Sequence, residues 1–188
     1  VGGKTAIDTD AGKNLVGLIH QPRLVLADLD VLSTLPERER RAGLAEVVKS
    51  AIIAPSSLDH LVERWLGPVS KGDLDGAGEL IAGAMRVKAD VVAIDERERG
   101  PRQALNLGHT LGHALEAATD YRRFLHGEAV TWGLLAVLRL ARDRGLLSTA
   151  EAQSWAGRLE RLAPLPRIDD VCWEHVRPFV YRDKKRRQ

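Results

Sequence analysis

The hydrophobic pattern of this chain changes near residue 33, and the change limits the folds that the sequence can adopt. Before that point, the apolar run RLVLAD at 23–28 indicates a buried strand, residues 5–8 are a weaker strand candidate, and 10–14 has the composition of a turn. After it, the pattern is helical. We therefore expect a mainly α fold, in which a short β segment, 1–33, ends an α/β domain and a helical domain covers 34–188.

Capping and helix-breaking residues separate the expected helices. Ser33 or Thr34 can cap the first helix, which Gly43 is expected to interrupt. A cap at 148–149, with Glu151 close behind, starts the last helix. The other expected spans are 43–53, 58–65, 73–94, 104–118 and 128–145, and the last helix reaches about residue 162.

Composition argues against several classes of protein. The 188 residues carry a net charge of +2, which is too small to indicate nucleic acid binding. No apolar run approaches the ~20 residues of a membrane span, and no signal peptide is visible. The single cysteine, Cys172, excludes an internal disulfide and favours a reducing compartment, so we expect a cytoplasmic protein. Because the chain begins with Val1 and its one methionine is Met85, we expect it to be a fragment.

Half of the histidines are grouped in a pattern typical of a metal site. On a helix, His109 and His113 stand four residues apart and project from one face, and His126 follows across a short loop. A chain can build a nitrogen-rich metal site in this way without cysteine. The alternative is two surface histidines and a capping one. Because Thr110 follows His109, the His-Glu-x-x-His motif of zinc proteases, with its general base, is absent.

Three charged residues fall on helix faces that should be apolar. Glu46 lies in a segment, 43–54, that is apolar nearly all round, where a lone carboxylate is costly unless it is paired or bound to a metal. Lys49 is either its intrahelical partner or a group that faces an anionic ligand. Lys88 falls on the apolar stripe of its helix, and it either snorkels to the edge or points into a cleft that binds an anion.

These residues together indicate an anionic substrate beside a divalent metal. Arg102, Lys4 and Lys13 add further cations near turns. Two histidines and one carboxylate leave an open coordination position, which suits Zn²⁺ acting as a Lewis acid on a substrate oxygen. His113 then has three candidate roles, as a fourth ligand, a phosphate contact or a proton carrier, and the spacing does not decide among them.

Several separated segments carry a further pattern. They are VGGKT (1–5), GKN (12–14), AGLAEVVK (42–49), KADVV (88–92), DE (95–96), LNLGHTLGH (105–113) and LHGEA (125–129). In this order and at these intervals, they resemble the 3-dehydroquinate synthase family. The resemblance covers residues 1–130, and RDKK (182–185) adds a weaker match.

The resemblance implies a lyase of the shikimate pathway, which serves aromatic amino acid biosynthesis. Such an enzyme uses NAD and a divalent metal to convert 3-deoxy-D-arabino-heptulosonate 7-phosphate to 3-dehydroquinate and phosphate. Residues 1–33 are then the end of an α/β NAD-binding domain, and 34–188 is the helical domain that binds metal and substrate. The implied ligands of the metal, Zn²⁺ or Co²⁺, are Glu46, His109 and His126.

The other residues implied by the resemblance group by role. The contacts on the phosphate side are Lys4, Asn14, Lys49 and His113. The contacts to the substrate carboxylate and ring hydroxyls are Lys88, Arg102, Asn106 and one lysine of the pair Lys184 and Lys185. The implied catalytic residues are Glu98 and His113, for proton transfer, and Lys49. The contacts to NAD are Lys13, Val31, Leu32, Ser33 and Thr34.

Two departures from the family pattern limit what this chain should do. The glycine-rich N-terminal half of the family is missing, and the chain stops soon after the RDKK segment. We therefore expect this fragment to bind metal and anion without forming 3-dehydroquinate, and phosphate release with added NAD and Zn²⁺ would contradict that expectation. In the full-length form we expect a homodimer.

Other functions stay open at this point. Related sugar-phosphate cyclases share the fold, including enzymes for an aminated substrate, although Lys88, Arg102 and Asn106 favour a substrate that carries a carboxylate. Metal-dependent alcohol dehydrogenases share the architecture but would not need as many cations. A non-catalytic domain that binds metal or forms a dimer is a different class, as is a purely structural helical domain, which zinc would not stabilise.

Overall fold

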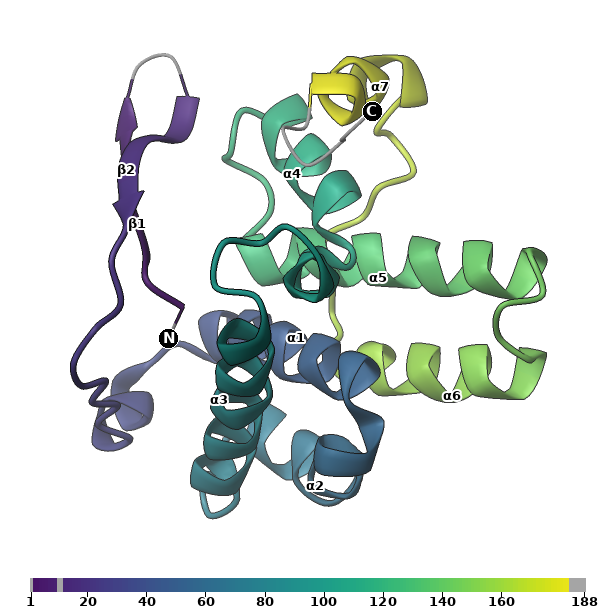
Figure 1. Ribbon diagram of the computed structural model, residues 1–188. Coiled ribbons are helices and arrows are strands. Elements are labelled where there is room, and N and C mark those ends of the chain that lie inside the picture. The colour runs from purple at the N-terminus through teal and green to yellow at the C-terminus, as the bar shows by residue number, and fades with distance from the viewer. Residues whose placement is uncertain (1, 10–11, 183–188) are drawn as a thin grey trace.

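The computed structural model describes residues 2–9 and 12–182, with the backbone alone at 8 and 12–15 (Figure 1). The strands are β1 (Lys4–Thr9) and β2 (Gly12–Ile19), and the 3₁₀ helices are η1 (Asp30–Thr34) and η2 (Pro101–Asn106). The α-helices are α1 (Glu37–Ile53), α2 (Pro55–Ser70), α3 (Ala77–Ile94), α4 (His109–Ala118), α5 (His126–Asp143), α6 (Thr149–Glu160) and α7 (Trp173–Arg182). The expected fold, a helical domain preceded by a short β segment, is confirmed.

The β segment is a hairpin that stands beside the helices. β1 and β2 pair antiparallel, which confirms the strand candidate at 5–8. The strand expected at 23–28 is wrong, because these residues are not paired with another strand and the side chains of Leu24 and Leu26 are 72% and 85% exposed. A strand needs a neighbour for its backbone hydrogen bonds, and the described part of the chain offers none at this place.

Two of the expected helix breaks do not occur. α1 runs through Gly43, since the roughly 1 kcal/mol cost of a helical glycine is small beside the burial of the helix's apolar residues. α2 likewise does not end at the expected residue 65 but continues through Pro68 to Ser70. Ser33 and Thr34 do not cap α1, because their hydroxyls donate to carbonyls inside η1.

The cap expected on the last long helix is confirmed. Glu151 donates its backbone N–H to Oγ of Ser148 over 3.2 Å, and the Glu151 carboxylate accepts from the Ser148 N–H over 2.8 Å. These two bonds form the reciprocal capping box that the spacing of the two residues predicts. α7 was not expected, although Trp173, Val176 and Val180 stand at the i, i+3, i+7 spacing of an amphipathic helix.

The expected helix 104–118 is divided into η2 and α4 by Gly108. Its backbone is left-handed, with φ of 76°, and a Cβ at this position would lie 2.9 Å from the backbone N of Leu134. Glycine is favoured in this conformation because other residues pay a steric cost. As a result His109 becomes the first residue of α4.

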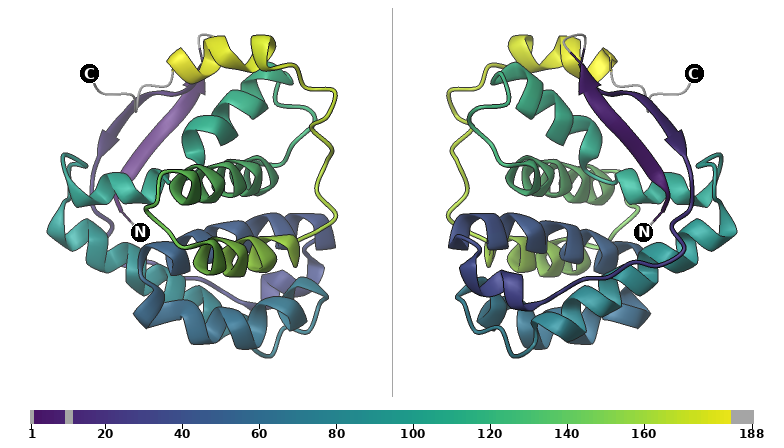
Figure 2. Two further views of the ribbon diagram at one scale, coloured as in Figure 1. Left: turned by 90° about the vertical axis from the view of Figure 1, so that its right-hand side faces the viewer. Right: turned by 90° about the vertical axis from the view of Figure 1, so that its left-hand side faces the viewer.

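Two apolar cores position the helices that carry the histidines. The larger core joins α1, α2, α3, α5 and α6, and its fully buried side chains include Val48, Leu58, Leu66, Leu134 and Leu159. The smaller core joins α4, α5 and α7. Figure 2 shows α5 between the layer of α1 and α6 and the pair of α4 and α7. α5 therefore holds α4 and α1 on its two sides. Within the described residues, no helix combines the length and apolar character needed to cross a bilayer.

Candidate metal centre

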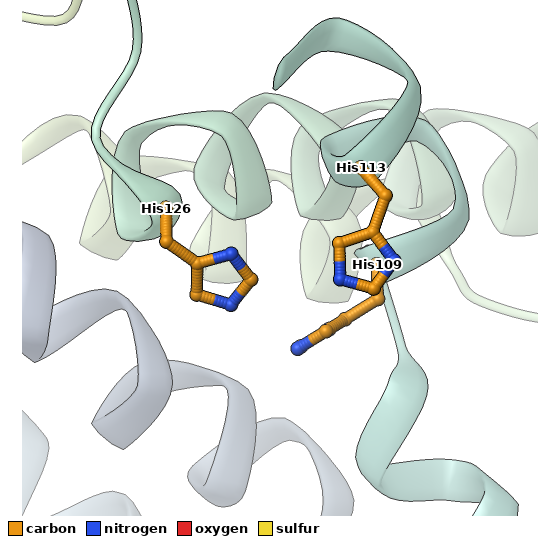
Figure 3. A group of neighbouring side chains, drawn as sticks. All are labelled: His109, His113 and His126. Carbon is orange, nitrogen blue, oxygen red and sulfur yellow. The ribbon is translucent and has the colours of Figure 1, made fainter. Parts of the chain in front are cut away.

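The three histidines of the sequence pattern converge at one point. His109 and His113 project from α4, and His126 is the first residue of α5 (Figure 3). One ring nitrogen of each lies within 4.8 Å of the others, and the ring centroids are 5.2 to 5.7 Å apart. Imidazoles this close, aimed at one space, form a set of donors that suits a divalent transition metal.

Glu46 of α1 brings a carboxylate close to two of the imidazoles. Its Oε1 lies 3.5 Å from Nε2 of His109 and 3.8 Å from Nε2 of His126. This oxygen is buried and has no hydrogen-bond partner. A buried carboxylate oxygen without a partner costs free energy, and a cation held between the three atoms would remove that cost. The geometry therefore fits a metal bound by Glu46, His109 and His126.

The intrahelical ion pair expected between Glu46 and Lys49 is present. Nζ of the buried Lys49 donates to Oε2 of Glu46 over 2.5 Å, which is the intrahelical ion pair. The other oxygen stays available to the histidines. Burial raises the pKa of Glu46, but the charge and hydrogen bond of Lys49, helped by the two imidazoles, bring that pKa below its ordinary value. The carboxylate is therefore ionised near neutral pH, as a metal ligand must be.

Hydrogen bonds behind the imidazoles orient two of them. Nδ1 of His109 lies 3.1 Å from the carbonyl oxygen of Leu107, and Nδ1 of His126 lies 3.0 Å from Oε2 of Glu116. A carbonyl can only accept, so Nδ1 of His109 carries the proton and its Nε2 lone pair faces Glu46. Such outer contacts fix the tautomer and the ring orientation of metal-binding histidines.

Glu116 is a site residue that the sequence reasoning missed. Its side chain is buried and comes from the same helix as His109 and His113. The signal was present in the spacing, because residues at 109, 113 and 116 share one helix face. A carboxylate on the same face as a histidine pair predicts a partner for one of the imidazoles.

The Glu116→Gln variant should bind Zn²⁺ about 10 to 100 times more weakly, the usual effect of losing an outer-shell partner of a metal-bound histidine. The neutral amide keeps the size of the side chain but accepts a weaker bond from His126. Isothermal titration calorimetry measures the effect, with Glu160→Gln, at an exposed position of α6, as the control. An unchanged affinity in Glu116→Gln would show that Glu116 does not tune the site.

Burial also keeps His109 neutral. Desolvation, with the charge of Lys49 as the next cause, lowers the pKa of His109 to about 4, and Glu46 only partly opposes this. A neutral imidazole is the form that binds a metal.

The same shift predicts how stability depends on pH. Between pH 6.5 and about 4, His109 is protonated in the unfolded chain but neutral in the folded chain. The free energy of unfolding of the metal-free chain should therefore fall as the pH drops from 6.5 through about 4, by up to about 3 kcal/mol. Urea denaturation across this range measures it, and His109→Asn should flatten the curve. A curve of unchanged slope in His109→Asn would contradict the assignment.

Cations gather beside the metal centre. Lys88 of α3 has a lowered pKa, caused first by desolvation and then by the positive charges of Lys49 and Arg102, which Glu46 partly offsets. The three positive charges of Lys49, Lys88 and Arg102 together create a local positive field, which favours an anionic ligand.

Arg102 is buried and joins two distant parts of the chain. Its Nη1 donates to the carbonyl of Glu96 over 2.5 Å, and its Nη2 donates to the carbonyl of Gly2 over 2.7 Å. Arg102 thereby holds the start of the described chain against the loop before η2.

The loop before η2 brings three predicted site residues together. Glu98 contacts both Lys4, through an ion pair, and Asn106, through a hydrogen bond. Its φ of 58° is rare outside glycine, so neighbouring contacts must hold it. Asp95 supplies them, because its carboxylate accepts the backbone N–H groups of Arg99, Gly100 and Arg102 over 2.7 to 3.1 Å.

The residues predicted to contact NAD, Lys13 and 31–34, lie in β2 and η1. Val31, Leu32, Ser33 and Thr34 form η1, ahead of α1, and Leu29 just before them lies against α3 at Gly78. Leu32 packs on the larger core, whereas Val31 is 62% exposed. The side chains of Lys13 and Asn14, and all of Lys184 and Lys185, lie outside the part of the chain that the structure describes.

Comparison with known proteins shows which family the chain matches. The family model for the C-terminal part of 3-dehydroquinate synthase matches residues 43–186, and the model for its N-terminal part matches 1–42. The chain is 49% identical over 169 residues to 3-dehydroquinate synthase of Koribacter versatilis, covering 90% of this chain and 46% of that protein. It is 41% identical over 185 residues to that of Solibacter usitatus, covering 98% and 52%. The chain thus spans about half the length of the curated relatives it matches.

Solved structures of related cyclases share the fold. 2-Epi-5-epi-valiolone synthase from Streptomyces hygroscopicus, with NAD⁺ and Zn²⁺ bound, superposes with a TM-score of 0.82 at 29% identity, covering 97% of this chain and 51% of that one. 2-Deoxy-scyllo-inosose synthase, complexed with carbaglucose-6-phosphate, NAD⁺ and Co²⁺, superposes with a TM-score of 0.80 at 25% identity, covering 98% and 50%. With two family models accounting for residues 1–186 and close relatives across its length, the chain belongs to the 3-dehydroquinate synthase family.

Proposed function

We propose that this chain forms the metal- and substrate-binding part of an enzyme that converts 3-deoxy-D-arabino-heptulosonate 7-phosphate to 3-dehydroquinate and phosphate. The observation that carries the proposal is the buried Oε1 of Glu46, which lacks a hydrogen-bond partner and faces Nε2 of both His109 and His126. Residues 1–33 are the end of the NAD-binding domain in this proposal, and 34–188 is the helical domain.

Two bound groups belong to the proposed site. Glu46, His109 and His126 hold Zn²⁺ or Co²⁺, and Lys13 with the 31–34 segment contacts NAD. The related cyclases whose solved structures hold NAD⁺ with Zn²⁺ or Co²⁺ support this pairing. When bound, NAD supplies a reversible oxidant for a ring alcohol and the metal polarises the oxygen of that alcohol.

The cations of the site bind the two anionic ends of the substrate. Lys4, Asn14, Lys49 and His113 hold the phosphate, while Lys88, Arg102, Asn106 and one of Lys184 and Lys185 hold the carboxylate and ring hydroxyls. The positive field shared by Lys49, Lys88 and Arg102 supports this assignment. Binding energy at both ends orients the ring between them.

The chain's own residues also handle charge and protons during the reaction. Lys49 and His113 stabilise phosphate as it leaves, and an oxygen of that phosphate can take the neighbouring C–H proton. Glu98 holds or moves a proton on the ring side, and its contacts with Lys4 and Asn106 keep it near the substrate groups that those residues bind. We place the enzyme in the cytoplasm, as a homodimer in its full-length form.

Two assays test the proposal. The 188-residue chain should bind one Zn²⁺ per molecule in calorimetry, without turnover. A fusion that adds the preceding part of the Koribacter versatilis synthase should release phosphate from the substrate when NAD and Zn²⁺ are present. Absence of zinc binding by the chain would overturn the metal site, and a fusion that binds zinc but releases no phosphate would overturn the activity.

A second candidate is a related cyclase with another substrate, since the solved relatives form other carbocycles by name. Three predicted carboxylate contacts, Lys88, Arg102 and Asn106, favour the first candidate. The same fusion, offered the aminated substrate analogue in parallel, distinguishes the two by which compound releases phosphate.

A further inference from the structure

The N-terminus of α5 crosses α1 beside the metal centre through three contacts in a row. Along α1, Arg38, Ala42 and Glu46 are spaced by four residues and lie on one broad face. They meet three consecutive residues of α5 in reverse order, which are Glu128, Gly127 and His126.

The outer contact is a bidentate ion pair. Nε and Nη2 of Arg38 donate to the two oxygens of Glu128 over 2.6 and 2.8 Å. The Glu128 side chain is only 5% exposed, and it also accepts the backbone N–H of Leu125 over 2.8 Å. Arg38 donates in addition to the carbonyl of Arg123 over 3.0 Å, so one guanidinium ties α1 to the segment that leads into α5.

The middle contact brings backbone against backbone. A Cβ on Gly127 would lie 1.8 Å from the carbonyl oxygen of Ala42, so the two helices touch where Gly127 has no side chain. A contact of this kind allows close approach, but it offers no side chain that interlocks and sets the register. A metal site requires its ligands within a few tenths of an ångström, so a directional contact must set the register nearby.

We propose that Arg38 and Glu128 are positioning residues that set the register of α1 against α5, so that Glu46 and His126 share one cation. The inference rests on the metal site proposed above. The fork of an arginine on both oxygens of a carboxylate fixes distance and orientation together, which a point charge does not. Along α1, Arg38 lies one helical turn before Ala42, and Glu46 lies one turn after it. A shift of α1 along α5 at the Arg38–Glu128 pair would therefore also move Glu46 relative to His126.

Metal affinity and cobalt spectra of the 188-residue chain test the proposal. Arg38→Met keeps the aliphatic part of the side chain and removes the guanidinium. It should weaken Zn²⁺ binding about 10- to 100-fold, which is the usual effect of removing a group that orients a metal ligand. The visible absorption of bound Co²⁺ should change as well, because it reports coordination geometry. Arg38→Lys, which keeps the charge, should give an intermediate affinity. The double variant Arg38→Met and Glu128→Gln should lose no more zinc affinity than the more affected of the two single variants, since the two residues act as a unit.

Arg158→Met is the matched control. Arg158 joins α6 to α2 through Asp59 and Glu63, at 2.9 and 3.4 Å, outside the metal centre. The Arg158→Met variant should be less stable than the unmodified chain, but its zinc affinity and cobalt spectrum should be unchanged.

Equal losses of affinity in Arg38→Met and Arg158→Met would overturn the positioning role, as would an unchanged affinity and spectrum in Arg38→Met. If Arg38→Met does not fold, the same comparison is made with Arg38→Lys. If the unmodified chain binds no zinc, the metal site itself is wrong, which distinguishes that failure from failure of the positioning role alone.

Discussion

The Glu46→Gln variant will bind Zn²⁺ at least about 100-fold more weakly than the unmodified chain, beyond the usual range for outer-shell changes, because it removes a ligand directly. The amide keeps the shape of the side chain but loses the charge that faces His109 and His126. It also leaves the buried Lys49 without its ionised partner, so the metal-free variant should be less stable too.

Thermal and chemical denaturation with and without zinc separate these two effects. At a zinc concentration well above both dissociation constants, a 100-fold loss of affinity removes about 2.7 kcal/mol of zinc-dependent stabilisation. The measurement without metal gives the loss of stability that comes from leaving Lys49 without its ionised partner. Glu160→Gln, an exposed change of the same kind, should alter neither quantity. A Glu46→Gln chain that gains as much stability from zinc as the unmodified chain would show that Glu46 is not a ligand.

The second large effect is expected from Gly127→Ala, which should lower the free energy of unfolding by about 3 kcal/mol or more, at the upper end of what overpacking costs. The added methyl group would lie 1.8 Å from the carbonyl oxygen of Ala42, and a backbone atom within a helix cannot move aside as a flexible side chain does. α5 must then move away from α1, which separates His126 from Glu46. Zinc affinity should fall in the same variant.

The control is the same substitution where space is open. A Cβ on Gly157 of α6 or Gly43 of α1 would meet no atom within 4 Å. Gly157→Ala and Gly43→Ala should therefore raise the free energy of unfolding by roughly 0.5 to 1 kcal/mol, through helix propensity. Urea denaturation compares the three variants, and a Gly127→Ala chain as stable as the other two would contradict the close approach of the helices.

The proposed metal ligands show how much of the site the sequence predicts. The spacing of His109 and His113 predicts that they share one helix face. Glu46 is a candidate ligand because a carboxylate is unusual in an apolar segment. His126 follows the histidine pair across a short loop, and the family resemblance implies that Glu46, His109 and His126 are the ligands. The roles of the metal, substrate and cofactor residues, and the boundary near residue 33, stay predictions.

The partners of these ligands were much harder to predict. Arg38 and Glu128 are 90 positions apart in sequence, and no local pattern pairs them. Asp95 stood within a recognised motif, yet its role as acceptor for three backbone N–H groups depends on how its loop folds back. The expected strand at 23–28 failed for a related reason, because an apolar run indicates a strand only when a neighbouring strand exists to pair with it.

Local patterns in the chain were enough to predict the helical class, the capping box at Ser148 and the shared face of His109 and His113, because these depend on interactions within one or two helical turns. In contrast, Oε1 of Glu46 is buried without a hydrogen-bond partner, close to the imidazoles of His109 and His126, because of how distant helices pack together. That outcome depends on α1, α4 and α5 packing through shared cores. The relative placement of helices is set by the sum of many distant contacts, which no short segment of the chain encodes.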